Sequence, residues 1–336
     1  MATSATAVSF RSVRDRMTTR LNQELILLFS LVVLTIGTTS YNDRFLRWNN
    51  LSDILGNSSF VAVAAIGMSM VIISGNIDIS VGSLIGVLMT IAGRLALELA
   101  AHDYPVWIAF IVPLFAGALV GVFNGFMVAY LGIPAIVVTL GMMSILQGGL
   151  ILWTSGEWIY GLPSDFQLAQ KDLFGLPVPV YFMVTLTILA ALWMRYSAAG
   201  RSIYALGGNA DAARLAGISR RRVLMMVFII NGFMVGVASV LFATQYTSIQ
   251  STVPPGTLIL IISAAVIGGV SILGGVGTVI GAMLGAILLR TINSSMSFLD
   301  VSQYWLGAIQ GILILTTVLI DLMRRRRQSY LMTKRT

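Results

Sequence analysis

One carboxylate, Asp78, lies in the polar stretch SGNIDISVGS, which separates two long apolar runs. An acidic side chain at membrane depth costs free energy unless it lines water or finds a hydrogen-bonding partner. Asn76, Ser80 and Ser83 can supply partners for Asp78 or for backbone groups that a helix break frees. The pattern predicts either a polar lining or hinge of a transport path, or a helix–helix turn in which Asp78 or Ser80 caps the next helix.

Neutral amide and hydroxyl side chains within the apolar runs form a second group. They are Asn124, Thr139, Gln147, Asn231 and Gln245. Such groups bind the hydroxyls of polyols, and Asn or Gln also forms hydrogen bonds between packed helices. Helix packing explains each residue taken singly, whereas the group as a whole predicts that some members line a substrate path.

The chain has few residues that could catalyse a reaction or bind a metal or phosphate. Cysteine is absent, which excludes thiol catalysis, disulfides and cysteine metal sites, and His102 is the single histidine. The glycine-rich stretch from Gly268 to Gly277 lacks the Lys-Ser/Thr ending of a phosphate-binding loop, so it is interpreted as a tight turn. We therefore expect no enzyme activity, no ATP hydrolysis and no bound cofactor or metal.

The composition is that of an integral membrane protein. Of the 336 residues, 57% are hydrophobic and only 10% are charged, against about 25% in soluble domains. A span needs about 20 mainly apolar residues, and the chain contains about ten such runs. They are Glu24 to Thr39, Ser59 to Ser74, Val81 to Leu99, Val106 to Tyr130, Ile133 to Trp153, Val178 to Met194, Val223 to Ala243, Leu258 to Ile272, Val276 to Ile292 and Gln303 to Leu322. The expected fold is an all-α polytopic bundle.

The basic residues predict the orientation. Most lysines and arginines lie in three clusters, at 11–20, 195–222 and 324–335, and an even number of predicted spans separates each pair. The positive-inside rule places all three clusters, and so both termini, in the cytoplasm. Because these charges flank apolar runs, the net charge of +8 does not indicate nucleic-acid binding.

The predicted spans and the positive-inside rule together divide the chain into three parts. We expect a cytoplasmic N-terminal tail (1–22), a permease domain (23–322) and a basic cytoplasmic tail (323–336). Within the permease domain, 154–177 forms the largest outer loop and 196–222 a cytoplasmic loop. Residues 41–57 form a second outer segment, interpreted as a surface helix capped by Asn50 or Ser52.

The cytoplasmic loop is predicted to contain a short helix. Asn209 is a good N-cap, Ala210 to Ala216 favours helix, and Gly217 suits the C-terminal end. A helix this short is marginal alone in water, so a partner that docks against it would fix it. The alternative is a solvated loop held near lipid headgroups by Arg220, Arg221 and Arg222.

Glycines recur at four-residue spacing in three predicted spans, which indicates closely packed helices. The sets are Gly82 and Gly86; Gly117, Gly121 and Gly125; and Gly277, Gly281 and Gly285. The first and third sets follow a polar or glycine-rich break and precede Arg94 and Arg290, respectively. This echo is consistent with a duplicated half, as in many transporters, and equally with chance.

Four stretches resemble the permeases of sugar-type ATP-binding-cassette importers, the ribose/xylose/arabinose class. They are SGNIDISVGS, NGFMVAYLGIPAIVVTLGMM, GRSIYALGGNADAARLAGISRRRV and ISAAVIGGVSILGGVGTVIGAMLGA. They occur in the family's order and extend the resemblance over roughly residues 51–321. Within that class, ILWTSGEWIYGLP is most similar to rhamnose and autoinducer-2 permeases.

The resemblance implies several partners. These are a second permease, identical or similar, a sugar-type ATPase subunit and a periplasmic sugar-binding protein. It also implies that the segment from Gly207 to Gly217 contacts the ATPase, although family members often carry Glu at position 211 and sometimes Ser at 216. The docking residues would be Gly208, Asn209, Asp211, Ala212, Arg214, Leu215 and Gly217.

The expected function is therefore uptake of a monosaccharide or similar small polyol through the bacterial inner membrane, driven by a separate ATPase. The alternative is an ion-coupled secondary transporter with Asp78 as the coupling carboxylate. An intramembrane enzyme would need paired carboxylates, histidine ligands or an activated nucleophile, for which the chain has little material.

Overall fold

The fold is a bundle of helices, as the apolar runs predict. The computed structural model describes the backbone of residues 24–333, with side chains through 319 and at 322 and 323. Eight helices in this part are long and apolar enough to span a membrane. They are Glu24–Tyr41, α2 (Trp48–Ile73), α3 (Val81–Ala101), α4 (Ile108–Ala129), α5 (Ala135–Thr154), α6 (Val178–Tyr196), α9 (Arg220–Ala243) and α11 (Val279–Phe298).

Two of the predicted spans differ from the expectation. Leu258 to Ile272 was expected as one span, but α10 (Thr257–Ile267) ends early and the chain continues without helix from Gly268 to Thr278. Positive φ angles at Gly269, Gly274, Gly275 and Gly277 account for this break, because that backbone region favours glycine. The last helix, α12 (Trp305–Thr333), has a shorter apolar part, Trp305–Leu319.

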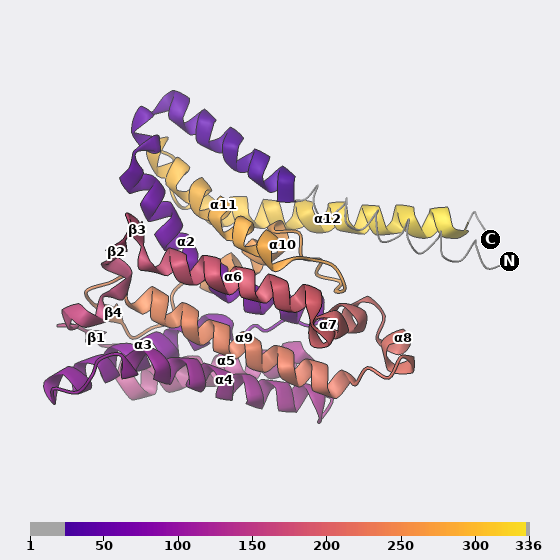
Figure 1. Ribbon diagram of the computed structural model, residues 1–336, viewed down its shortest axis with the longest axis horizontal. Helices are drawn as coiled ribbons and strands as arrows, with labels where there is room; N and C mark the ends of the chain where they lie inside the picture. The colour runs from indigo at the N-terminus through magenta and orange to yellow at the C-terminus, as the bar shows by residue number, and fades with distance from the viewer. Residues whose placement is uncertain (1–23, 334–336) are drawn as a thin grey trace.

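Helix α2 forms the centre of the bundle (Figure 1). It contacts α6, α9, α10 and α11, and 94% of its most apolar window is buried. By contrast, α4, α5 and α6 lie on the outside and bury about a third or less of theirs. The central position of α2 explains why Ser74, Asp78 and Ser80, in the polar break at its C-terminal end, are also buried.

The pair formed by α4 and α9 packs through glycines, as their spacing predicts. A Cβ built at Gly117 would overlap the carbonyl oxygen of Gly232, and one built at Gly121 would overlap that of Phe228. Gly125 faces Met225, one turn nearer the start of α9. Small residues therefore bring the two backbones into direct contact.

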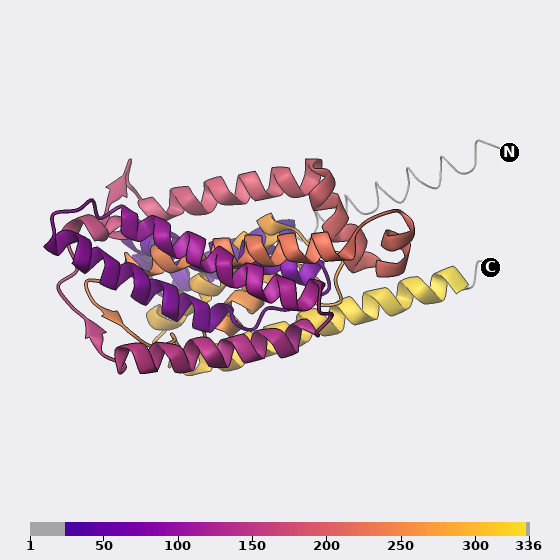
Figure 2. The same ribbon diagram turned by 90° about the horizontal axis from the view of Figure 1, so that it is seen from below.

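The two ends of the bundle differ. One end carries α7 (Ala198–Gly208), α8 (Ala210–Leu215) and the start of α9, and α12 continues past it; this is the α7–α8 end (Figures 1 and 2). The opposite, strand end carries two antiparallel pairs. They are β1 (Trp158–Ile159) with β4 (Ile249–Gln250), and β2 (Asp172–Leu173) with β3 (Leu176–Pro177). Short 3₁₀ helices η1 (Asp43–Leu46), η2 (Ser164–Phe166) and η3 (Leu168–Gln170) lie there too.

The predicted surface helix over 41–57 is wrong. Asn42 caps η1 by accepting a hydrogen bond from the backbone N–H of Arg44, and α2 then begins at Trp48. Asn50 is not a cap, since its side chain donates to the carbonyl of Phe45. Burial from Ile54 onward extends α2 into a single 26-residue helix.

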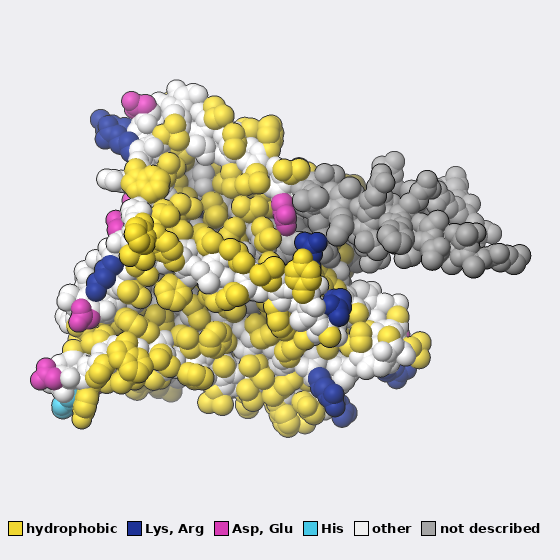
Figure 3. Space-filling view, viewed as in Figure 1, with side chains coloured by type: hydrophobic (Ala, Val, Ile, Leu, Met, Phe, Trp, Pro, Cys, Tyr) yellow, Lys and Arg dark blue, Asp and Glu magenta, His cyan; other side chains and the backbone are white. Residues whose placement is uncertain are grey.

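Hydrophobic side chains cover the middle of one face, and charged side chains lie mainly towards its ends (Figure 3).

The predicted N-terminal tail lies outside the described residues. The predicted cytoplasmic loop, 196–222, contains α7, α8 and the first turn of α9, while the backbone of α12 continues through 323–333.

We expect Gly121→Ala to destabilise the protein, because its Cβ would overlap a carbonyl oxygen of α9. Overpacking of this kind costs about 1–3 kcal/mol. The control is Gly37→Ala, where nothing lies within 4 Å of the added Cβ. Both changes raise helix propensity by about 1 kcal/mol. Thermal unfolding in detergent should show a lower Tm for Gly121→Ala alone; equal Tm values would contradict the packing account.

Candidate functional site

The short helix predicted after Asn209 is present. Helix α8 spans Ala210–Leu215, and the Asn209 side chain accepts a hydrogen bond from the N–H of Ala212 at 2.9 Å. Gly217 ends the segment with a φ of +80°. Sequence reasoning missed the preceding helix, α7, although its cap, Ser197, is a typical one and accepts from the N–H of Gly200.

One side of this segment is anchored and the other is exposed. Gly200, Ile203 and Leu206 of α7 and Ala213 of α8 are buried. Leu215 is 85% exposed, an unusual state for a leucine outside the apolar middle of the bundle. The seven residues predicted to dock an ATPase are all exposed: Gly208, Asn209, Asp211, Ala212, Arg214, Leu215 and Gly217. The segment therefore presents a preformed surface at the α7–α8 end.

A close junction of glycines joins this segment to two breaks in the bundle. A Cβ at Gly207 of α7 would overlap the carbonyl oxygen of Ile73, the last residue of α2. The N–H of Gly275, in the break after α10, donates to that same carbonyl at 2.8 Å. A Cβ at Gly274 would lie 2.9 Å from the carbonyl oxygen of Gly207 and 3.1 Å from the Cα of Gly75. We call Gly75, Gly207, Gly274 and Gly275 the glycine junction.

Tyr204 adds a side-chain link to this junction. Its hydroxyl donates to the carbonyl of Gly277 at 2.9 Å, so α7 is bonded directly to the chain just before α11. Thr278, the next residue, caps α11 and also donates to the carboxylate of Glu24 at 2.8 Å. The docking segment thus contacts both the break before α3 and the break before α11. Sequence reasoning gave no signal for these contacts, because they join segments far apart in the chain.

Asp78 is the centre of a buried polar cluster. One of its carboxylate oxygens accepts from the backbone N–H of Ser80 at 3.0 Å and from the Ser80 hydroxyl. The other accepts from the Asn231 amide at 2.9 Å, and the Asn124 amide donates to the Ser80 hydroxyl at 3.1 Å. All four side chains are at most 2% exposed. The cluster ties the break before α3 to α4 and α9.

This geometry decides the local role of Asp78. Ser80 occupies the N-cap position of α3 but makes no side-chain cap hydrogen bond. Asp78 instead fixes the backbone of Ser80, and each of its oxygens accepts at least one hydrogen bond. The side-chain oxygens of Asn124 and Asn231 accept no hydrogen bond from a described residue. The arrangement satisfies a helix break within the bundle, as the packing interpretation of these residues predicted.

The other predicted path or hinge residues do not join this cluster. Asn76 bonds within its own break, to Ser74, and Thr139 donates to the carbonyl of Ala135 on its own helix. Gln245 donates to the carbonyl of Gly56, near the strand end. Ser83 is buried one turn into α3. The part of the chain that the structure describes holds no group of three His, Asp or Glu side chains able to bind a metal.

Comparisons with known proteins agree with this architecture. Residues 50–318 match the family described as "Branched-chain amino acid transport system / permease component". The "Autoinducer 2 import system permease protein LsrC" of Salmonella paratyphi B is 36% identical over 301 residues, covering 89% of this chain and 86% of that protein. The proteins of the same name from Escherichia coli O9:H4 and Enterobacter sp. are each 35% identical and cover 89% of this chain and 87% of those proteins.

We expect Asp78→Asn to retain most of the stability, whereas Asp78→Leu does not. The Asn oxygen can still accept from Ser80, and Asn231 can rotate its amide to offer the oxygen that now has no partner. Leucine would leave buried donors unsatisfied, at a cost of about 1–3 kcal/mol each. Thermal unfolding measures this difference. Uptake by Asp78→Asn, at constant ATP and with an uncoupler present, should persist; its loss would favour the ion-coupled alternative.

Gly207→Ala should disrupt the glycine junction, because a Cβ there overlaps the carbonyl of Ile73. The matched control is its neighbour: nothing lies within 4 Å of a Cβ at Gly208. For the permease alone, we expect Gly207→Ala to lower Tm and to speed protease cleavage in α7 and α8. Gly208→Ala should match the wild type in both measurements. If both variants matched the wild type, the junction would not hold the docking segment.

Proposed function

Since this chain belongs to the branched-chain amino acid transport system permease family, we propose that it carries a monosaccharide or similar small polyol into the cytoplasm. As a permease component of an ATP-binding-cassette transporter, it is not itself the ATPase, and it lies in the bacterial inner membrane as a multi-pass protein. The observation that supports transport driven by a separate ATPase is the exposed docking segment, which the glycine junction attaches to both helix breaks.

We place the α7–α8 end in the cytoplasm. The end carries Arg201, Arg214 and the run Arg220 to Arg222, all exposed. Excess arginine next to apolar spans marks the cytoplasmic side. In this orientation the docking segment faces the compartment that contains ATP, and the strand end faces a periplasmic binding protein. A separate sugar-type ATPase would then bind α8 from the cytoplasmic side.

The proposed mechanism follows from the contacts of that segment. An ATPase that closes on ATP would move α8, and α7 would transmit the movement through Gly207 to the ends of α2 and α10. The two breaks would then change position relative to α4 and α9. Such a shift moves substrate only if the outward- and inward-facing states differ in their contacts with the ATPase and the binding protein.

The proposal for the substrate rests on two features. The relatives are named for the import of autoinducer 2, and ILWTSGEWIYGLP, at the end of α5, is similar to their class. On α5 itself, Ser144 and Gln147 are exposed beside Gly141 and Gly148, where a Cβ would meet nothing within 4 Å. The Ser144 hydroxyl donates to the carbonyl of Leu140 on its own helix, so Gln147 is the side chain here that needs a partner or water at membrane depth. We propose that this face meets a second permease subunit and a path for hydroxyl-bearing substrates.

Leu215→Asp tests the docking role of α8. Leu215 contributes an exposed apolar contact, so an acidic group there should reduce co-purification of the ATPase subunit at least tenfold and abolish uptake. The control is Tyr304→Asp, which changes a 97% exposed residue near the strand end and should leave ATPase co-purification unchanged.

Uptake assays test the proposed function as a whole. Cells with the permease and binding protein, but without the ATPase subunit, should accumulate no labelled sugar. Undiminished accumulation would refute the mechanism. A panel of labelled pentoses, deoxyhexoses and autoinducer 2, offered to the complete transporter, should identify a polyol substrate; uptake of branched-chain amino acids alone would refute that class.

A further inference from the structure

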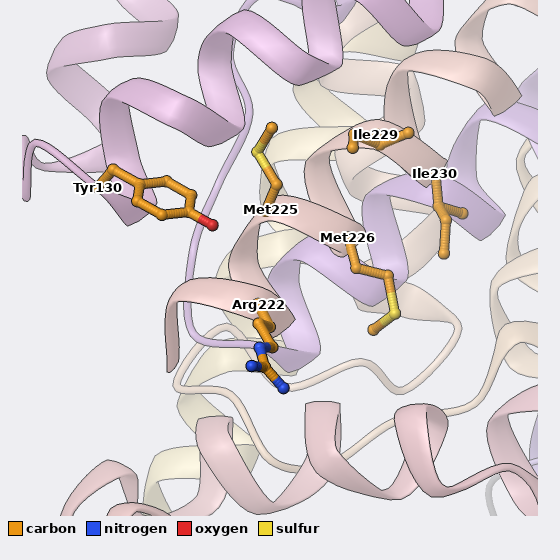
Figure 4. A pocket seen from close by; sticks show the side chains of 6 residues that line it. All are labelled: Tyr130, Arg222, Met225, Met226, Ile229 and Ile230. Carbon is orange, nitrogen blue, oxygen red and sulfur yellow. The ribbon is translucent and has the colours of Figure 1, made fainter. Parts of the chain in front are cut away.

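A shallow, open groove of about 340 Å³ lies on the side of α9, near the α7–α8 end. Its lining residues come from the first three turns of α9 and from the end of α4. They are Tyr130, Arg222, Met225, Met226, Ile229 and Ile230. Figure 4 shows the Tyr130 hydroxyl directed towards α9; Arg222 lies one turn before the methionines and two turns before the isoleucines. We call this the α4–α9 groove; it is apolar along its length and polar at one end.

The apolar part of the groove continues into the outer surface of α4. Leu119, Phe123 and Phe126 on that helix are 69%, 49% and 46% exposed. In a chain that spans a membrane, such side chains face lipid hydrocarbon. The four α9 residues are half-buried, so they form a floor on which a flexible apolar chain can lie. Methionine and isoleucine provide that floor without polar groups.

The polar end of the groove carries excess positive charge. Arg220, Arg221 and Arg222 occupy the first turn of α9, which holds no acidic residue. The only ion pair among the described residues joins Lys171 to Asp165, so none of these arginines pairs with a described carboxylate. Arg221 instead stacks over the Tyr130 ring at 5.9 Å. This contact holds the tyrosine beside the groove, and the guanidinium of Arg222 remains available to an anion.

We propose that the α4–α9 groove binds an anionic phospholipid. One acyl chain would lie on Met225, Met226, Ile229 and Ile230, and the headgroup phosphate would accept from Arg222 at the polar end of the groove. Basic pockets between spans, at the level of the headgroups, suit this class of lipid. In the orientation proposed above, the lipid comes from the cytoplasmic leaflet. It would sit where α9 follows the docking segment, and would so hold that end of α9 in place.

Native mass spectrometry of the complete transporter provides the test. The complex is first equilibrated in nanodiscs of phosphatidylcholine with 20% phosphatidylglycerol, and retained lipid is then counted. Wild type should retain one phosphatidylglycerol for each permease, in preference to phosphatidylcholine. Arg222→Gln should lower retention about tenfold, because it removes a charge-assisted hydrogen bond to the phosphate that Arg220, outside the groove lining, does not make. Ile229→Trp, which fills the groove without a change of charge, should lower it as much.

The matched control is Arg220→Gln, which removes the same charge from the same helical turn but not from the groove lining. It should retain lipid within twofold of the wild type. The proposal is overturned if Arg222→Gln or Ile229→Trp retains as much lipid as the wild type, or if Arg220→Gln loses as much as Arg222→Gln. It is also overturned if the permease alone retains the lipid and the ATPase-bound complex does not, because the groove would then belong to the ATPase contact.

Discussion

The structure depends on one constraint: backbone polar groups inside a membrane bundle must find partners within the protein. Two connections between helices meet here: Ser74–Ser80 joins α2 to α3, and Gly268–Thr278 joins α10 to α11. Each break would leave buried carbonyls and N–H groups unsatisfied if it stood alone. The carbonyl of Ile73 instead accepts from the N–H of Gly275, so the connection between α10 and α11 satisfies the end of α2. The carboxylate of Asp78 accepts from the N–H of Ser80 and so satisfies that backbone group. Asn124 of α4 and Asn231 of α9 donate to Ser80 and Asp78, respectively, and complete the cluster. The two breaks are thus parts of one buried arrangement.

The breaks also explain where the docking segment is attached. Helix α7 packs against the bundle at the point where both breaks meet, and Gly207 has no side chain because the Ile73 carbonyl takes its place. A bulkier residue would push α7 away from the hydrogen bond between Gly275 and Ile73. The rigid α4–α9 pair lies on the other side of the first break and shares its polar cluster. In the proposed mechanism, a displacement of α8 would therefore reach the breaks before it reaches the close-packed helices, since packed cores resist continuous deformation.

Local features were predictable from the sequence, and contacts between distant segments were not. The apolar runs located every long helix, and Asn209 with Gly217 located α8, because these signals act within a few residues. The four-residue glycine spacing predicted the close approach of α4, whose partner, α9, it did not name. The predicted surface helix over 41–57 was wrong because burial of α2 extends the helix past any local cap signal. In the glycine junction, Gly207 and Gly275 both contact the carbonyl of Ile73, and neither composition nor spacing indicates that these three positions meet.

Asp78 shows how far a single polar residue can be interpreted from sequence. Its depth and its serine neighbours are equally compatible with a path, a hinge and a cap, because each requires a satisfied carboxylate. Its partners indicate a structural role: the carboxylate accepts from the backbone N–H and hydroxyl of Ser80 and from the amide of Asn231. Ser80 is the last residue of the break before α3 and Asn231 lies on α9, so Asp78 fixes the position of that break relative to α9. The carboxylate belongs to the framework that holds the start of α3 against α9, and we propose that the hydroxyl-binding groups of a path lie on the exposed face of α5.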